Sequence, residues 1–418
     1  MDILWDINNT CNLKCKHCGA ADCMDLVTLP KDSEIDIVLS NIGKIATSVT
    51  LVGGEPLLHT KIDYILARLS QQNIQISIIT NGQFDPAIID TILKHNIANI
   101  TVSIEGNEAI NDQIRGVGSW RKATRFLEGL VKRVQHHPHL EIAVATVINR
   151  INRNDIISWL EYLQRYPLAY IQLSPLYETG RAAENCNMLS LTENELVDTC
   201  EDISLYLHSN SVNNVRLPIG NAAVISFLNL KYGLSFTNEK YECNAFLGSA
   251  YCDYSGVLHP CRTVSEPSVS LVTPQQWNTV FREKFSILHK LYSGDTPCNT
   301  FCFAASKCGV CPLVDKHITP LCKEVFDRLD RSFPRTTKLR LIEPSCLYMV
   351  DNQYYAIFQH SGSIIEYSAE GFSILKELDH GWNSLNNILD NSNLPRQVVF
   401  HFLLQEILEG RIRFEKEE

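Results

Sequence analysis

Short apolar runs alternate with segments of helical periodicity through the first 175 residues of the chain. The runs predict strands, and the intervening segments, such as 33–46 with apolar residues at helical spacing, predict helices. Six strand–helix units in alternation predict a parallel sheet with crossover helices. The expected strands are 2–7, 48–52, 75–79, 99–103, 141–148 and 169–174, and the expected helices are 33–46, 60–71, 86–95, 119–135 and 153–165.

This alternation predicts an α/β fold. Several of the strands, such as the run at 75–79, are almost continuously apolar, which predicts a sheet covered on both faces. Because six units are too few to close an eight-stranded barrel, we expect a partial (β/α)6 TIM barrel with an open side. In such barrels the site lies where the strands end, at their carboxyl ends.

The rest of the chain divides into three further regions. Residues 186–242 carry a helix near 192–208 and then a polar connection, and cysteines crowd between 243 and 322. From about 340 three short strands precede three helices, which predicts a small α+β winged-helix-like C-terminal domain. The predicted domains are a barrel at 1–210, a bridging region at 211–242, a cysteine-rich domain at 243–330 and the C-terminal domain at 340–418.

Composition and charge limit the class of partner. The chain has 418 residues and a net charge of −10, which argues against a nucleic acid as a partner. No stretch reaches the ~18–20 apolar residues of a membrane span, and no secretory signal is visible. We therefore expect a cytoplasmic protein without a membrane partner. Without a secretory signal, the 15 cysteines are better explained by metal or cluster ligation than by disulfides.

Cys11, Cys15 and Cys18 form a CxxxCxxC loop after the first expected strand. Three thiolates can hold three corners of a cubic iron–sulfur cluster and leave one iron open. Zinc loops usually pair with a second, distant pair of ligands, so zinc fits this triplet poorly. The loop resembles the signature of the radical S-adenosylmethionine (radical SAM) enzymes. That resemblance implies a [4Fe–4S] cluster whose open iron binds S-adenosylmethionine and whose electron cleaves it to a 5′-deoxyadenosyl radical.

Further motifs after the expected strands strengthen the resemblance. Gly53-Gly54-Glu55-Pro56 looks like the family's GGEP motif, which implies backbone contacts to the amino group of S-adenosylmethionine. Ser103 resembles the serine that meets the ribose, and Arg115 resembles the arginine near the carboxylate. A plain glycine turn and a solvated arginine are the structural alternatives.

Two more residues are implied to lie at the adenine of S-adenosylmethionine. His17 stands where the family usually has an aromatic residue, and its ring would lie against the adenine. Leu176, in a loop with Ser174-Pro175 and Gly180-Arg181, would be an apolar contact. Thr80-Asn81-Gly82 after the third strand reads only as a turn.

The second cysteine region resembles the SPASM extension of radical SAM enzymes, although its C-x3-C-x5-C-x2-C core exchanges the family's outer intervals. The resemblance implies a SPASM auxiliary-cluster domain with two [4Fe–4S] clusters, and so three clusters in the chain. The implied ligands are Cys243, Cys252, Cys261 and Cys311 for the first auxiliary cluster, and Cys298, Cys302, Cys308 and Cys322 for the second. Two structural Zn(Cys)4 sites are the alternative that the spacing permits.

Arg262 directly follows Cys261, where SPASM enzymes that mature sulfatases carry an aspartate base. Arginine cannot act as a base at neutral pH, which argues against sulfatase maturation and leaves the base unassigned. We expect the remaining Cys23, Cys186, Cys200 and Cys346 to be buried small side chains. A thiol that donates a hydrogen atom is the less favoured reading.

The C-terminal strands and helices resemble the PqqD-like element that recognises precursor peptides. The resemblance implies an enzyme that binds the leader of a ribosomally made peptide and modifies its core by hydrogen abstraction. The product would be a thioether, carbon–carbon or ether crosslink, or an epimerised residue, and a flavodoxin or ferredoxin would donate electrons. The alternatives are a radical SAM enzyme for a small molecule or protein residue, with this domain as a scaffold, and a non-enzymatic zinc scaffold.

Overall fold

The computed structural model describes residues 1–19, 32–219, 222–234, 236, 245–262, 264–273, 276–292, 322, 324–325, 327–329, 331, 337–342, 345–350, 353–358, 363–379 and 381–415. These residues fall into two compact units. The first unit contains the described residues up to 292 except 222–234 and 236, and the second contains those two segments and the described residues from 322 onward.

A ten-stranded sheet forms the centre of the first unit, in the order β10-β9-β8-β1-β2-β3-β4-β5-β6-β7. All neighbours from β8 through β1 to β7 are parallel, and β9 and β10 are antiparallel additions. The strands are β1 (Asp2–Asp6), β2 (Ser48–Val52), β3 (Gln75–Thr80), β4 (Ile97–Ser103), β5 (Glu141–Ile148), β6 (Tyr170–Pro175), β7 (Val215–Arg216), β8 (Ser249–Cys252), β9 (Val257–His259) and β10 (Val269–Ser270). The large parallel sheet confirms the predicted α/β fold and partial barrel.

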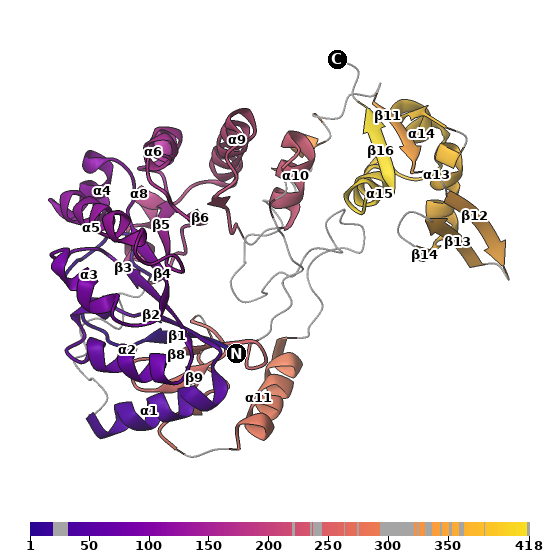
Figure 1. Cartoon of the computed structure of the whole chain (residues 1–418). Helices are drawn as coiled ribbons and strands as arrows, with labels where there is room; N and C mark the ends of the chain where they lie inside the picture. The colour runs from indigo at the N-terminus through magenta and orange to yellow at the C-terminus, as the bar shows by residue number, and fades with distance from the viewer. Residues whose placement is uncertain are drawn as a thin grey trace. The chain divides into compact units, whose positions relative to one another are not determined.

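The helices that follow strands β2 to β5 lie along the outer side of the curved sheet (Figure 1). The helices of this unit are α1 (Asp32–Ile45), α2 (Ile62–Gln71), α3 (Ala87–Ile92), α4 (Glu108–Arg115), α5 (Ser119–Val134), α6 (Ile156–Leu163), the short α7 (Gly180–Glu184) and α8 (Cys186–Leu189), α9 (Glu193–Asn210) and α11 (Trp277–Tyr292). The sequence pattern predicted α1, α2, α3, α5, α6 and α9, but it did not predict α4, α7, α8 or α11. α4 lies in the loop after β4 and carries Arg115.

Local capping explains where two of these helices begin. Thr192 and Glu195 form a capping box at the start of α9. α5 has a glycine at its N-cap, and Asp112 of α4 takes over the capping role there. Its carboxylate accepts hydrogen bonds from the backbone N–H groups of Gly118 and Trp120 at 2.6 and 2.9 Å. The side chain of one helix therefore fixes the start of the next.

The two faces of the sheet differ in burial. In β3, Ile76 and Ile78 are fully buried, whereas Ser77 and Ile79 are only half-buried. β2 and β6 show the same alternation. The prediction of a sheet covered on both faces is therefore wrong for these strands, because the open barrel leaves its inner face partly accessible.

β8 joins the sheet from a distant part of the sequence. It pairs in parallel with β1, with Leu4 opposite Tyr251 and Trp5 opposite Cys252. β9 then returns antiparallel to β8 through a turn in which Gly256 has a φ of +79°. The first strand of the second cysteine region, β8, thus lies in the same sheet as β1, the strand that leads into the CxxxCxxC loop.

The second unit contains two small antiparallel sheets among its described residues. β12 (Ser345–Val350), β13 (Gln353–Phe358) and β14 (Ser363–Tyr367) form one, and β11 (Lys338–Leu341), β15 (Asn383–Ser384) and β16 (Ile412–Glu415) form the other. The helices are α10 (Ala222–Tyr232), α13 (Ala369–Asp379), α14 (Leu385–Asn391) and α15 (Arg396–Leu408). Three strands followed by three helices were predicted. The β11-β15-β16 sheet was not predicted, because its strands are very short and pair across long sequence separations.

Candidate active site

The CxxxCxxC loop follows β1 at the carboxyl end of the sheet. Cys15 is buried, and Cys11 and Cys18 are half-buried. Two backbone contacts hold the loop in place: Lys16 N–H donates to the carbonyl of Ile114 in α4 at 2.9 Å, and Arg181 Nε donates to the carbonyl of Cys15 at 3.0 Å. Elements after β4 and after β6 therefore anchor the loop.

Hydrogen-bond donors surround two of the three sulfur atoms. Cys11 Sγ accepts from Leu13 N–H at 3.4 Å and from Asn81 Nδ2 at 3.7 Å, and Cys15 Sγ accepts from an Arg115 guanidinium nitrogen at 3.9 Å. Burial raises the pKa of Cys11 and raises that of Cys15 to about 11. Cysteine sulfurs become thiolates when a metal binds them, and donors of this kind stabilise metal-bound thiolate. The loop therefore fits three ligands of an iron–sulfur cluster.

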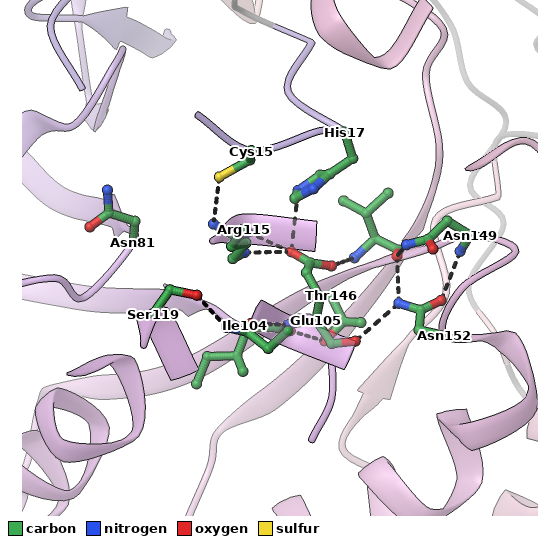
Figure 2. A network of polar contacts seen from close by, with 12 residues as sticks. Cys15, His17, Asn81, Ile104, Glu105, Arg115, Ser119, Thr146, Asn149 and Asn152 are labelled. Atoms are coloured by element: carbon green, nitrogen blue, oxygen red, sulfur yellow. Dashed lines mark hydrogen bonds and ion pairs between the residues drawn. The ribbon is translucent and has the colours of Figure 1, made fainter. Parts of the chain in front are cut away.

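Glu105 is the centre of a buried polar network beside the loop (Figure 2). Arg115 Nε donates to its Oε1 at 2.9 Å, His17 Nε2 lies 3.3 Å from the same oxygen, and Val147 N–H donates to Oε2 at 2.8 Å. Burial alone would raise the pKa of Glu105, but His17 and Arg115 outweigh it and lower the pKa to about 2. Glu105 thus remains ionised and fixes the positions of both Arg115 and His17.

The network brings together two of the predicted site residues. His17 and Arg115 meet on Glu105, and Arg115 extends the contact to Cys15. The Nδ1 atom of His17 is buried and has no hydrogen-bond partner among the residues that the structure describes. The predicted contacts of His17 and Arg115 with S-adenosylmethionine stay predictions. The role of Glu105 was missed, although a carboxylate at the end of an apolar strand, between Ser103 and Gly106, was a usable signal.

Gly53 and Gly54 lie against the chain's own backbone at the start of the cysteine loop. A Cβ at Gly53, where φ is +126°, would be 2.3 Å from the carbonyl oxygen of Asn8. A Cβ at Gly54 would be 2.2 Å from the carbonyl oxygen of Thr10. The backbone N–H of Gly54 donates to Asn8 at 3.0 Å, which closes this contact. Glycine is therefore required for the approach of the two loops, in addition to any contact with a ligand.

Glu55 connects the second and third strand ends. Its Oε1 accepts from Thr80 Oγ1 at 2.8 Å and from Leu57 N–H at 3.1 Å, and its Oε2 accepts from Asn81 N–H at 2.7 Å. Burial raises its pKa to about 7. Thr80 and Asn81 were expected to form only a turn. The structure shows more, because Asn81 contacts both Glu55 and the sulfur of Cys11.

Ser103 and Leu176 occupy the strand ends where the sequence placed them. Ser103 is the last residue of β4 and pairs with Ala145 of β5. Leu176 directly follows β6, and both side chains are half-buried. Their roles as ribose and adenine contacts stay predictions.

The second cysteine region is described at three of its eight predicted ligands. Cys252 is buried at the end of β8, and Cys261 and Cys322 are half-buried. None of the cysteines in the described residues forms a disulfide. Cys243, Cys298, Cys302, Cys308 and Cys311 lie outside the described residues. The two predicted ligand sets therefore stay predictions.

The other cysteines differ from one another in exposure. Cys200 is buried, as expected, and burial raises its pKa. Cys186 is half-buried, and Cys346 is exposed on β12, so the prediction of burial is wrong for Cys346. An edge strand with one face open to solvent explains that exposure. Cys23 lies outside the described residues.

None of the described helices combines the length and the apolar character that crossing a bilayer requires.

Residues 5–163 match the family model described as "Radical SAM superfamily". This segment contains the cysteine loop, the glycine motif and the Glu105 network.

Two curated relatives show the range of similar proteins. The chain is 25% identical over 194 residues to mycofactocin maturase MftC of Mycolicibacterium smegmatis, which covers 44% of this chain and 46% of that protein. It is 24% identical over 235 residues to Fe-coproporphyrin III synthase of Methanosarcina barkeri, covering 55% of this chain and 58% of that protein. The chain thus spans about half the length of these relatives.

Two solved structures share the fold at low sequence identity. The anSMEcpe structure with bound AdoMet and Kp18Cys peptide matches with a TM-score of 0.60 and 16% identity, over 79% of this chain and 97% of that one. Streptococcus suis SuiB bound to precursor peptide SuiA matches with a TM-score of 0.58 and 17% identity, over 75% and 72% of the two chains. At these identities the likeness establishes the fold.

Proposed function

Residues 5–163 of this chain belong to the radical SAM superfamily, and from that premise we propose that the chain is a radical SAM enzyme that modifies a ribosomally made precursor peptide. The observation that carries the proposal is the CxxxCxxC loop at the carboxyl end of β1, with donors from Asn81 and Arg115 on its sulfur atoms. A cluster held by this loop would supply the electron for the reductive cleavage of S-adenosylmethionine, the chemistry that precedes hydrogen abstraction from the peptide.

The chain's own residues would have three roles around that cluster: ligands, a buried ion pair and contacts to S-adenosylmethionine. Cys11, Cys15 and Cys18 would be its ligands. Glu105 holds Arg115 against Cys15, so the arginine keeps a fixed direction toward the site. Contacts to S-adenosylmethionine would come from the strand ends, namely from His17, Gly53, Gly54, Glu55, Ser103, Arg115 and Leu176.

The second cysteine region would hold two auxiliary [4Fe–4S] clusters, with the two ligand sets given by its resemblance to the SPASM extension. Support comes from β8, which places Cys252 on the strand next to β1. A flavodoxin or ferredoxin would deliver the electrons. Together with the cluster at Cys11, Cys15 and Cys18, the chain would hold three [4Fe–4S] clusters.

The peptide would bind to the second unit. Both outer strands of the β12-β13-β14 sheet have an unpaired edge in the described residues, and both carry exposed apolar side chains. Met349 is 58% exposed in β12, and Ile364 is 64% exposed in β14. Tyr367 of β14 contacts α15 through a hydrogen bond to Glu406 at 2.6 Å. A leader peptide could therefore add as a strand to β14 beside α15.

The test combines cofactor chemistry with peptide binding. Protein purified without oxygen should contain iron and sulfide, bind S-adenosylmethionine with a change in its EPR spectrum, and form 5′-deoxyadenosine. Co-expression with a short peptide encoded beside the gene should give a mass change in that peptide. A colourless protein that contains zinc would refute the enzyme and support the scaffold alternative.

A pair of surface variants tests the peptide-binding sheet. Ile364→Asp places a charge on the β14 edge and should weaken peptide binding about tenfold. The matched control is Leu205→Asp, since Leu205 is an exposed apolar residue of α9 in the first unit. Equal peptide affinity in both variants would contradict binding at β14.

A second candidate function is that of a radical SAM enzyme that acts on a small molecule. Two of the similar curated proteins are Fe-coproporphyrin III synthase and AdoMet-dependent heme synthase, both of Methanosarcina barkeri. This reading predicts S-adenosylmethionine cleavage without affinity for any encoded peptide, and it leaves the second unit as a scaffold.

A further inference from the structure

A buried carboxylate joins the first strand of the sheet to the second cysteine region. Asp6 is the last residue of β1 and is 5% exposed. One guanidinium nitrogen of Arg262 donates to both carboxylate oxygens at 2.9 Å. The hydroxyl of Tyr251 donates to Oδ2 at 2.8 Å. Side chains from two other segments of the chain therefore meet on the Asp6 carboxylate.

These three residues are neighbours of proposed cluster ligands in both cysteine regions. The parallel pairing of β1 with β8 sets their positions, so the contact depends on the register of the sheet. Asp6 precedes the cysteine loop, Tyr251 stands directly before Cys252, and Arg262 stands directly after Cys261. The ion pair thus connects the segments that carry the two kinds of cysteine loop.

The guanidinium also lies within electrostatic reach of the first loop. Burial lowers the pKa of Arg262, but Asp6, Tyr251 and the Cys18 thiol outweigh it and raise the pKa. The guanidinium lies 5.7 Å from the centroid of the Tyr251 ring, and its side chain is 39% exposed. Arginine keeps its charge at any working pH, so a permanent positive charge lies at the end of β1, the strand that leads into the CxxxCxxC loop.

We propose that Arg262, held by Asp6, is a positioning residue whose charge makes the cluster at Cys11, Cys15 and Cys18 easier to reduce, while Asp6 offsets part of that effect. The inference rests on the proposed function, because it requires a cluster in that loop. The step is the transfer of one electron from the reduced donor protein to the oxidised cluster, without a bond change. Reduction adds negative charge, which a nearby cation stabilises and a nearby anion opposes.

The magnitude follows from Coulomb's law. At a separation of roughly 10 Å and an effective dielectric constant of about 20, one unit charge changes the ratio of reduced to oxidised cluster about tenfold. Removing Arg262 and removing Asp6 should therefore shift this ratio in opposite directions. A pair that only stabilises the fold would not produce opposite shifts.

The experiment is an EPR-monitored redox titration of the full-length, reconstituted protein. The component followed is the one whose spectrum changes when S-adenosylmethionine is added, because that change assigns it to the cluster with an open iron. At a fixed potential, Arg262→Gln should lower the reduced-to-oxidised ratio about tenfold, and Asp6→Asn should raise it. Arg262→Lys keeps the charge and should stay within about threefold of the unchanged protein.

Two further variants complete the design. The double variant Asp6→Asn/Arg262→Gln replaces both charges by amides and should return the ratio to within about threefold of the unchanged protein. Arg121→Gln is the control for net charge, because Arg121 is an exposed arginine that pairs with Glu108. It should leave the ratio unchanged.

The outcomes separate this inference from the proposed function. A protein without any component that responds to S-adenosylmethionine would overturn the proposed function and this inference with it. A responsive component whose potential is equal in all variants, or shifts in the same direction for Arg262→Gln and Asp6→Asn, would overturn this inference alone. If Arg262→Gln does not fold, Asp6→Asn and the double variant still carry the test.

Discussion

At the scale of single residues, the site depends on buried charges that satisfy one another. Glu105 has no exposed surface, and its partners His17 and Arg115 come from the cysteine loop and from α4. Removing one member of such a pair leaves an uncompensated charge, whereas removing both members costs much less. The network is therefore as much a requirement of the fold as of the chemistry.

Glu105→Leu should lower the free energy of unfolding by about 3–5 kcal/mol, because Arg115 then stays buried without its carboxylate. The double variant Glu105→Leu/Arg115→Met should recover a large part of that loss. Urea denaturation monitored by circular dichroism measures both. A double variant less stable than Glu105→Leu would contradict this account.

A second prediction concerns the glycine motif. Gly54→Ala places a Cβ against the backbone of Thr10, which cannot move aside, and should destabilise the protein by about 1–3 kcal/mol. Gly43→Ala is the matched control, because its Cβ would meet only the flexible end of the Gln72 side chain. As a change within α1, it should be neutral or stabilising by up to ~1 kcal/mol. Thermal unfolding distinguishes the two, and equal melting temperatures would refute the steric argument.

At the scale of elements, the loops after the strands are held by side chains from neighbouring elements. α4 supplies Asp112 to the start of α5, and its last turn supplies both Arg115 and the Ile114 carbonyl that anchors Lys16. Arg181 of α7 holds the cysteine loop from the other side. The loop that carries the proposed cluster ligands is thus fixed by two helices that follow distant strands.

The prediction at this scale concerns the cap of α5. Asp112→Ala should cost about 1–2 kcal/mol, because two N–H groups at the start of α5 lose their acceptor. Glu108→Ala is the control: Glu108 also links α4 to α5, but its pair with Arg121 is exposed and should contribute less than about 1 kcal/mol. Chemical denaturation of both variants measures the difference, and a larger loss for Glu108→Ala would contradict it.

The Asp112 contribution has a defined pH dependence. Burial would raise the pKa of Asp112, but its hydrogen bonds from Trp120 and Gly118 lower the pKa below 3.8. A depressed pKa stabilises the fold above the unfolded value and loses that effect as the pH falls through the folded value. The difference between the unchanged protein and Asp112→Ala should therefore stay constant from pH 8 to pH 5. A decrease within that range would show that another group is responsible.

At the scale of the whole molecule, two cysteine regions more than 200 residues apart share one sheet. β8 places Cys252 beside β1, and β1 leads into the CxxxCxxC loop. If each region holds its own clusters, removing one set of ligands should leave the others loaded.

The corresponding prediction is a change in iron content. The triple variant Cys11→Ala/Cys15→Ala/Cys18→Ala should lose about one third of the iron and sulfide and all cleavage of S-adenosylmethionine, because it lacks the ligands of one of the three proposed clusters. Cys346→Ala is the control, since this exposed cysteine lies outside the proposed ligand sets. Metal analysis and the visible absorption spectrum provide the measurement. Loss of all iron in the triple variant would contradict independent auxiliary clusters.

Sequence reasoning succeeded where the signal is local. Strand and helix positions follow from short-range periodicity, and three cysteines within eight residues must share one loop whatever the fold. It failed where a partner is distant in the sequence. Asn81 read as a turn residue, and its contacts with Glu55 and Cys11 depend on the parallel alignment of three strands.

The sequence by itself determined the alternating α/β pattern, the cysteine loop and the glycine motif, because each depends on residues a few positions apart. Only the tertiary structure decided that Glu105 joins His17 to Arg115, that Asp6 pairs with Arg262, and that β8 completes the sheet beside β1. The physical reason is that the energy of a buried charge depends on which partner the fold brings to it, and that partner can come from any part of the chain.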